Sequence, residues 1–323
     1  MSEPVKSKDW TVADIPSQAG RRALITGANS GIGYCAALEL ARKGAHVLLG
    51  CRDRAKGDAA LSRMRAEVPD ASAEVVIFDL ASLASVKMFA AEELERGVPL
   101  DLLINNAGVY RPKKRLETVD GFEIQFGTNV LGHFALTGLL MPALVRAAAS
   151  QRQRPRVVTV ASIAHKRGRI DFEDLQSTKN YSPADSYGQS KLANLMLAFE
   201  LERRLQAAGP PTSRVMSVSA HPGIADTNLF KVGDFGAAER VARGWVGAVI
   251  GALLNSDAEG ALPTLYAATA LDTKDGGYYG PQGFQEARGG DVGPGKVFPQ
   301  ALDEAVAARL WQECERLTDV RFL

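Results

Sequence analysis

Short runs of β-branched and aliphatic residues alternate with longer stretches rich in alanine and leucine along most of this 323-residue chain. The short runs predict strands, and the longer stretches predict helices that lead from one strand to the next. Because parallel strands need such crossover connections, the alternation favours a parallel sheet built from βαβ units. We expect strands at residues 23–26, 46–50, 74–78, 100–105, 156–161 and 214–219, and helices at residues 31–43, 54–68, 82–96, 121–149 and 187–207.

The expected strands are apolar throughout, which is typical of a sheet covered by helices on both faces. We therefore predict an α/β fold with a doubly wound parallel sheet of the Rossmann type. One domain is expected over residues 21–323, after an N-terminal extension at residues 1–20.

The pattern becomes less regular after residue 223, and we expect a C-terminal lobe of substrate-binding loops there. Residues 224–295 are expected to form a substrate lid and loops, and the apolar run around Trp245 suggests that this lid presents an apolar wall. Within the rest of the lobe we expect a helix near residues 257–270, a loop rich in glycine, tyrosine and proline at 275–295, and a terminal helix near 302–317.

Composition excludes several classes of protein. The 38 Lys and Arg residues nearly balance 37 Asp and Glu residues, so no dominant basic face for nucleic acid is expected. The three cysteines, Cys35, Cys51 and Cys314, have no metal-ligand spacing and form no disulfide framework, so we expect no metal and a reduced compartment. Residues 1–20 lack the apolar core of a signal peptide, and the apolar run at 244–256 is shorter than the ~20 residues of a spanning helix. We expect a cytoplasmic protein without stable membrane insertion.

A glycine-rich segment, TGANSGIG at residues 26–33, lies between an expected strand and an expected helix. Glycines let the backbone approach a ligand closely, and the N-terminus of the following helix offers free N–H groups to a pyrophosphate. A tight βα turn with incidental glycines is the alternative. The residues predicted to bind a dinucleotide here are Gly27, Asn29, Ser30, Gly31, Ile32 and Gly33.

The end of the second strand indicates which dinucleotide is preferred. An enzyme specific for NAD usually places an acid there, but this chain has Arg52, whose guanidinium can pair with a 2′-phosphate. Asp53 comes one residue too late, and Arg52 as a solvated surface charge remains an alternative. Asp79 and Leu80 follow the third strand and are expected at the adenine, although Asp79 could instead cap the next helix. The predicted cofactor is NADP(H).

Tyr187 and Lys191 form a Y-x-x-x-K pair, which lies on one face of a helix. A nearby ammonium favours phenolate, so we expect the pKa of Tyr187 to fall by roughly 1–3 units below about 10. Further markers follow other strands: NNAG at residues 105–108, Ser162, and Pro222 with Gly223. In doubly wound folds, ligands bind beyond the carboxyl ends of the strands, where these markers are expected to meet.

Together these motifs resemble the short-chain dehydrogenase/reductase family over residues 23–227. TGANSGIG, NNAG, a serine after the fifth strand and Y-x-x-x-K occur in the family's order. The insertion between Ser162 and Tyr187, the sequence CRD after the second strand, SKLANL at 190–195 and GGYYGP at 276–281 resemble the retinol-dehydrogenase-like branch.

The resemblance implies a role for each matched residue. Tyr187 would transfer a proton, Lys191 would bind the nicotinamide ribose, Ser162 would hydrogen-bond the substrate oxygen, and Asn129 would hold a water linked to Lys191. Asn129 as a helix-kinking residue and Ser162 as a strand-end cap are the structural alternatives. Tyr187 and Lys191 are also counted among the cofactor contacts, together with Asn106, Ala107, Gly108, Pro222, Gly223 and Thr227.

We therefore expect an NADP(H)-dependent carbonyl reductase or alcohol dehydrogenase that acts on an apolar aldehyde, ketone or alcohol. A catalytically silent dinucleotide-binding regulator or scaffold is the alternative, and a sugar-nucleotide epimerase is disfavoured by the glycine spacing and the short C-terminal lobe. His133 is interpreted as helix packing and residues 113–115 as a solvated loop edge. Whether the protein forms a homo-oligomer is left open.

Overall fold

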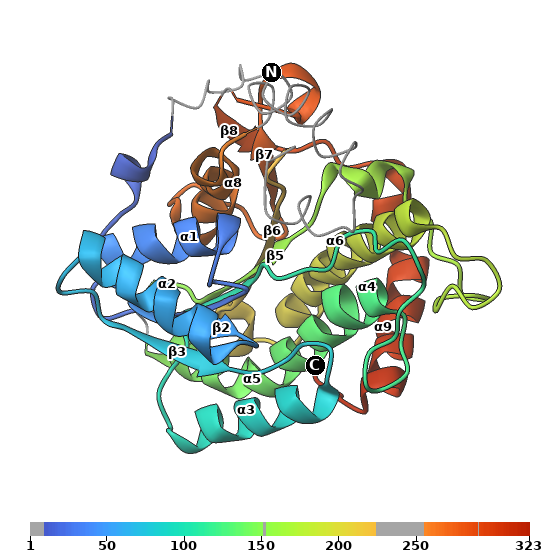
Figure 1. Cartoon of the computed structure of the whole chain (residues 1–323), viewed down its shortest axis with the longest axis horizontal. Coiled ribbons are helices and arrows are strands. Elements are labelled where there is room, and N and C mark those ends of the chain that lie inside the picture. The colour runs from blue at the N-terminus through green and yellow to red at the C-terminus, as the bar shows by residue number, and fades with distance from the viewer. Residues whose placement is uncertain (1–9, 151–152, 224–254, 290) are drawn as a thin grey trace, which may run out of the picture.

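An eight-stranded sheet runs through the protein in the order β3-β2-β1-β4-β5-β6-β7-β8 (Figure 1). The computed structural model describes residues 10–150, 153–223, 255–289 and 291–323. All neighbouring strands pair in parallel except β7 and β8, which are antiparallel. The strands are β1 (Arg22–Thr26), β2 (His46–Cys51), β3 (Ala73–Ile77), β4 (Leu102–Asn105), β5 (Arg156–Val160), β6 (Met216–Ala220), β7 (Tyr278–Pro281) and β8 (Val292–Pro294).

The strand order reverses between β1 and β4. From β1 the chain proceeds outward through β2 and β3, and it then returns to the other side of β1 to add β4, β5 and β6. Such a switch point leaves a crevice at the carboxyl ends of the two central strands, where ligands bind in doubly wound folds. The predicted doubly wound α/β fold is confirmed.

Helices cover both faces of the sheet, as the uniformly apolar strands predict. Successive strand residues face opposite layers: Leu24 belongs to the core shared with α3, α5, α6 and α9, and Ile25 to the core shared with α1, α2 and α8. The helices are α1 (Gly31–Arg42), α2 (Arg54–Glu67), α3 (Leu83–Glu95), α4 (Ile124–Phe126), α5 (Gly132–Ala149), α6 (Pro183–Ala207), α8 (Asp257–Thr269) and α9 (Glu304–Thr318).

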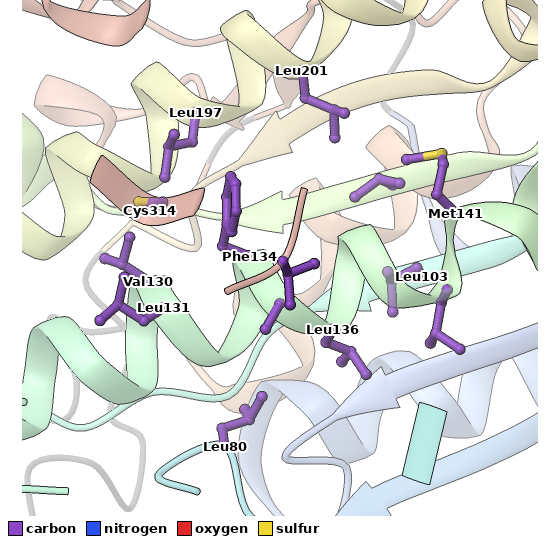
Figure 2. Close-up of a cluster of buried hydrophobic side chains, with 14 of the residues drawn as sticks. Leu80, Leu103, Val130, Leu131, Phe134, Leu136, Met141, Leu197, Leu201 and Cys314 are labelled. Atoms are coloured by element: carbon purple, nitrogen blue, oxygen red, sulfur yellow. The ribbon is translucent and has the colours of Figure 1, made fainter. Parts of the chain in front are cut away.

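The C-terminal helix α9 packs on α5 and α6. Trp311 of α9 is 1% exposed, and its ring lies edge-on to Phe134 of α5 with centroids 4.9 Å apart. Figure 2 shows Phe134 in one apolar cluster with Leu201 of α6 and Cys314 of α9. The last helix is therefore part of the main core and packs on α6, which carries Tyr187 and Lys191, and on α5, which directly follows the turn of Asn129.

One stretch, Ile124–Ala149, is long and apolar enough to cross a membrane. It comprises α4, the π-helical turn Gly127–Leu131 and α5, and 78% of its most apolar window is buried inside the protein. Its apolar character is accounted for by its place in the core between the sheet, α3, α6 and α9. This run is longer than the apolar run at residues 244–256, on which the expectation of no spanning helix was based.

Several boundaries differ from the sequence-based expectation. The loop expected at residues 275–295 contains β7 and β8. Both strands are short and rich in glycine and proline, so their local signal is weak, and pairing of Tyr278 with Ser219 of β6 supplies the register. The helix expected from residue 121 begins at Ile124, after an isolated bridge between Glu117 and Glu123. The helix of Tyr187 begins earlier, at Pro183, because Ser182 caps it and proline suits a first helical turn.

The N-terminal and C-terminal predictions are tested only in part. Trp10 packs edge-on against Tyr266 of α8, and Ile15 is 3% exposed, so the described part of the expected extension lies on the domain. Thr227 and most of the expected lid, including Trp245, fall at positions 224–254 and lie outside the described residues.

Candidate active site

The glycine-rich turn connects β1 to α1 in a shape that suits a phosphate. Gly27 and Gly31 adopt left-handed φ values of +68° and +61°. A Cβ on Gly33 would lie 2.6 Å from the carbonyl oxygen of Gly27, so only glycine fits there. Within the described part of the chain, Ser30 precedes α1 without making a side-chain cap. The first N–H groups of α1 are therefore available to an anion, and the turn fits the pyrophosphate of a dinucleotide.

Thr26, the last residue of β1, ties this turn to the NNAG segment. Its hydroxyl oxygen accepts hydrogen bonds from the backbone N–H groups of Asn106 and Ala107, each at 2.9 Å. The side-chain amide of Asn106 donates in return to the carbonyl oxygen of Thr26, at 2.8 Å. Hydrogen bonds therefore join the two segments that are predicted to bind the cofactor. Thr26 is a site residue for which the sequence predicted no role.

The residues predicted at the adenosine end lie after β2 and β3. Arg52 is exposed at the end of β2. The carboxylate of Asp53 caps α2 by accepting from the N–H of Lys56 at 3.0 Å, which explains an acid at this position without a ribose contact. One carboxylate oxygen of Asp79 accepts from the N–H of Ala81 at 2.9 Å, whereas Ser82 caps α3. Asp79 therefore shapes the strand-to-helix turn and is not the helix cap.

Asn129 sits in the π-helical turn between α4 and α5 and is fully buried. Its side-chain oxygen accepts from the N–H of Val109 at 2.7 Å, and its amide nitrogen donates to the Val109 carbonyl at 3.1 Å and to Ser190 Oγ at 3.1 Å. π-Helical turns are rare and occur often at functional sites. The Asn129 side chain thus connects Val109, the residue directly after NNAG, to α6.

Ser162 and Tyr187 meet at the end of β5. Ser162 follows β5, and its side chain hydrogen-bonds that of Tyr187, which lies in α6 and is 9% exposed. The same Ser162 oxygen accepts from the N–H of Ala164 at 3.2 Å, so it also caps the short helix Ile163–Arg167. The ring of Tyr110 lies edge-on to the Tyr187 ring, with centroids 4.7 Å apart. The interpretation of Ser162 as a cap is therefore confirmed, and its contact with the substrate oxygen stays a prediction.

The expected lowering of the Tyr187 pKa is wrong. Burial raises the pKa of Tyr187 above its ordinary value, and the hydrogen bond from Ser162 offsets only part of this rise. Lys191 donates its ammonium to the carbonyl oxygen of Val160 at 2.8 Å and lies 5.9 Å from the centre of the Tyr187 ring. Burial also lowers the pKa of Lys191 to about 8. The apolar surroundings, which the sequence argument left out, outweigh the ammonium.

Pro222 and Gly223 follow β6 and are held by the C-terminal lobe. Asn255 donates from its side-chain amide to the Pro222 carbonyl at 2.9 Å. Gly223 has φ +69°, and a Cβ there would lie 2.4 Å from the carbonyl oxygen of Ala287. This second close approach explains why glycine follows the proline.

The glycine-rich turn, NNAG, Ser162 and Pro222 with Gly223 follow β1, β4, β5 and β6, whereas Arg52 and Asp79 follow β2 and β3. A Cβ on Gly108 would lie 3.2 Å from Asn129 Oδ1 and 3.9 Å from Lys191 Nζ, so these groups border one small space. A buried phenol held by a serine hydroxyl can deliver a proton to an oxygen bound beside it. The residues that sequence reasoning missed are Thr26, Tyr110, His133 and Ser190; Thr26 and Ser190 lie inside the recognised motifs, which was the available signal.

Comparisons with known proteins agree with this geometry. The family described as short chain dehydrogenase matches residues 21–233. A polyprenol dehydrogenase of Mus musculus is 41% identical over 310 residues, which are 96% of this chain and 87% of that protein. Retinol dehydrogenase 13 of Homo sapiens is 40% identical over 318 residues, 96% of this chain and 89% of that protein.

A solved structure has the same fold and a similar sequence. The crystal structure of an uncharacterised protein from Mycobacterium paratuberculosis superposes with a TM-score of 0.77 at 42% identity, covering 98% of this chain and all of that one. The family match and the relatives agree with the arrangement of the motifs in the structure. The chain belongs to the short-chain dehydrogenase/reductase family of NAD(P)-dependent oxidoreductases, in the branch of the retinol dehydrogenases.

Proposed function

We propose that this protein is an NADP(H)-dependent carbonyl reductase or alcohol dehydrogenase whose general acid and base is Tyr187. The observation that carries the proposal is the buried phenol of Tyr187, held by Ser162 at the carboxyl ends of the strands. When bound, the nicotinamide supplies or accepts the hydride. Reduction of a carbonyl leaves an oxygen that needs a proton, and the phenol is placed to provide it.

The other three residues support this proton transfer. Ser162 orients the phenol and offers its hydroxyl to the substrate oxygen. Lys191, with a pKa of about 8, is near the point where an ammonium can exchange a proton at neutral pH. Asn129 bonds both backbone groups of Val109 and so fixes the preceding Gly108, which borders Lys191. We assign Asn129, Ser162, Tyr187 and Lys191 to the catalytic unit.

Two further observations support the choice of cofactor and substrate. Arg52 is exposed after β2, where its guanidinium is free to bind a 2′-phosphate through charge-assisted hydrogen bonds. The relatives are named for polyprenol and retinol, both long apolar alcohols. The edge-on ring of Tyr110 beside Tyr187 adds an aromatic wall next to the reacting group. An apolar aldehyde, ketone or alcohol therefore fits this site best.

A substrate series tests the proposal. NADPH consumption is followed with straight-chain aldehydes of increasing length and with small sugars of equal carbon number. Because apolar burial contributes roughly 25 cal/mol per Å², KM should fall as the chain lengthens. Preference for the sugars would contradict the substrate class, equal use of NADH would contradict the cofactor choice, and NADPH binding without turnover on any carbonyl would favour the silent regulator.

A further inference from the structure

His133 lies one turn after Asn129, on the first turn of α5, and is 5% exposed. Its ring joins two parts of the site. Nδ1 lies 3.0 Å from the backbone carbonyl oxygen of Asn129, and Nε2 lies 2.9 Å from the hydroxyl oxygen of Thr26. The sequence suggested only helix packing for this residue, but both ring nitrogens have polar partners.

The chemistry of these partners fixes the tautomer. A carbonyl oxygen only accepts, so the Asn129 contact requires a proton on Nδ1. Nε2 then accepts, and the Thr26 hydroxyl can donate to it because its oxygen already accepts from two backbone N–H groups. Burial lowers the pKa of His133 to about 4, and the nearby Lys191 ammonium adds to this lowering. The ring is therefore neutral at neutral pH, which this pattern of hydrogen bonds requires.

The contacts form a closed circuit through the site. Thr26 holds the backbone of Asn106 and Ala107, the chain continues to Val109, the Asn129 side chain binds Val109, and His133 returns from the Asn129 backbone to Thr26. Two routes therefore connect Asn129 to Thr26, one through Val109 and the NNAG segment and one through the His133 ring. The ring fixes the π-helical turn to the end of β1 directly, without passing through the NNAG loop.

We propose that His133 is a positioning residue that sets Asn129 against the dinucleotide-binding turn. The proposal rests on the proposed function, since it assigns part of the same reaction to this ring. Its Nδ1–H fixes the carbonyl of the π-helical turn, and its Nε2 anchors that turn to Thr26. Nδ1 therefore contacts the Asn129 side of the site and Nε2 the Thr26 side, and two different variants can remove these contacts one at a time.

His133→Asn and His133→Gln form a matched pair. The shorter asparagine amide reaches the place of Nδ1 and keeps the donor to Asn129, whereas the longer glutamine amide reaches the place of Nε2 and keeps the Thr26 contact. A cavity of about 40 Å³ beside the ring, lined also by Asn105 and Thr137, gives both amides room. Losing one hydrogen bond of this kind corresponds to about a three- to tenfold effect.

The expected result is a crossed pattern. His133→Gln should lower kcat by about three- to tenfold while the Kd of NADPH, measured by fluorescence titration, stays within about twofold. His133→Asn should keep kcat and raise that Kd by a similar factor. A merely structural ring would make both variants lose the same property, because both replace it with a smaller amide. Equal losses in both variants, or unchanged values in both, would overturn the proposal.

A measurement on the parent protein covers the case in which a variant does not fold. With ¹⁵N-labelled histidine, the His133 signal should show a protonated Nδ1 and an unprotonated Nε2, and it should shift when NADPH binds. The signal is assigned by replacing His46, His165 and His221 in turn. A proton on Nε2 would overturn the circuit. Absence of carbonyl reduction by the parent enzyme would instead contradict the proposed function, with the tautomer still decisive for the positioning role.

Discussion

The ammonium of Lys191 donates its hydrogen bond to the carbonyl oxygen of Val160, at 2.8 Å, while its distance to the centre of the Tyr187 ring is 5.9 Å. The charge of the lysine is therefore directed to the end of β5. Burial of the phenol raises the pKa of Tyr187, so the group holds its proton at neutral pH. In the proposed reaction, this protonated phenol is the form that can protonate a substrate oxygen.

The pH profiles of the two directions should consequently differ. Reduction uses the protonated phenol, so kcat should change little across the neutral range, where the raised pKa of Tyr187 keeps it protonated. Oxidation needs the phenolate, and its rate should rise about tenfold per pH unit toward alkaline pH. Steady-state rates in both directions from weakly acidic to alkaline buffers check this. An oxidation rate that is flat through the neutral range would show that bound cofactor lowers the pKa of Tyr187 strongly.

Replacing Tyr187 by phenylalanine keeps the ring and removes the proton. We expect kcat to fall by about 10²–10⁴-fold, the usual contribution of a positioned acid, while NADPH still binds. Tyr181→Phe is the matched control, because the Tyr181 hydroxyl donates to the carbonyl of Pro112 outside the catalytic unit. Steady-state assays of both variants test the assignment. Near-parental turnover by Tyr187→Phe would refute the proposed mechanism.

Arg52→Ala should weaken NADPH and leave NADH nearly unchanged. Loss of a charge-assisted contact costs about 1.5–3 kcal/mol, which corresponds to roughly ten- to over a hundredfold in Kd. Arg54→Ala is a suitable control, since Arg54 is exposed in the first turn of α2 and donates to the carbonyl of Val75. Titrations of both cofactors against parent and variants measure the effect. If Arg52→Ala weakens both cofactors equally, the 2′-phosphate assignment is wrong.

Trp311→Ala should destabilise the whole domain. The indole is 1% exposed, packs against Phe134, and is covered by the Arg204 guanidinium 4.5 Å from the ring centroid. Removing such a buried aromatic side chain costs about 3–5 kcal/mol of the free energy of unfolding. Leu302, which is 58% exposed, provides a control whose alanine variant should stay within about 0.5 kcal/mol of the parent. Urea unfolding of both variants measures these changes. An equally small effect of Trp311→Ala would show that α9 lies outside the main core.

Acid should destabilise the protein through His133 and His221. Burial lowers the pKa of each to about 4 from 6.5, so the folded state resists a proton that the unfolded state takes up. Each therefore contributes stability that is complete above pH 6.5 and is lost as the pH falls toward 4, by about 3 kcal/mol at most. Unfolding free energies at neutral and acidic pH should show this loss, and His221→Gln should reduce it. His46→Gln, at a half-buried histidine of β2, serves as the control variant, and an unchanged slope in His221→Gln would contradict the prediction.

The doubly wound sheet, and the grouping of the main motifs at its edge, follow from the order of residues along the chain. Six apolar strand runs separated by helical stretches leave few other arrangements, because parallel strands require crossovers and the buried faces require helices. The motifs at residues 26–33 and 105–108, together with the pair Tyr187 and Lys191, follow strand ends, and the carboxyl ends of parallel strands share one edge. Their meeting was therefore predictable without coordinates.

How the site residues are held and charged depends on contacts that form only when the chain is folded. Burial raises the pKa of Tyr187, and the i, i+4 spacing of Tyr187 and Lys191 says nothing about burial. The bonds from His133 to Asn129 and Thr26 require the π-helical turn, which shifts the backbone away from ordinary helical spacing. Strands β7 and β8 likewise form only because β6 offers a free edge, since short segments rich in glycine and proline carry little strand preference of their own.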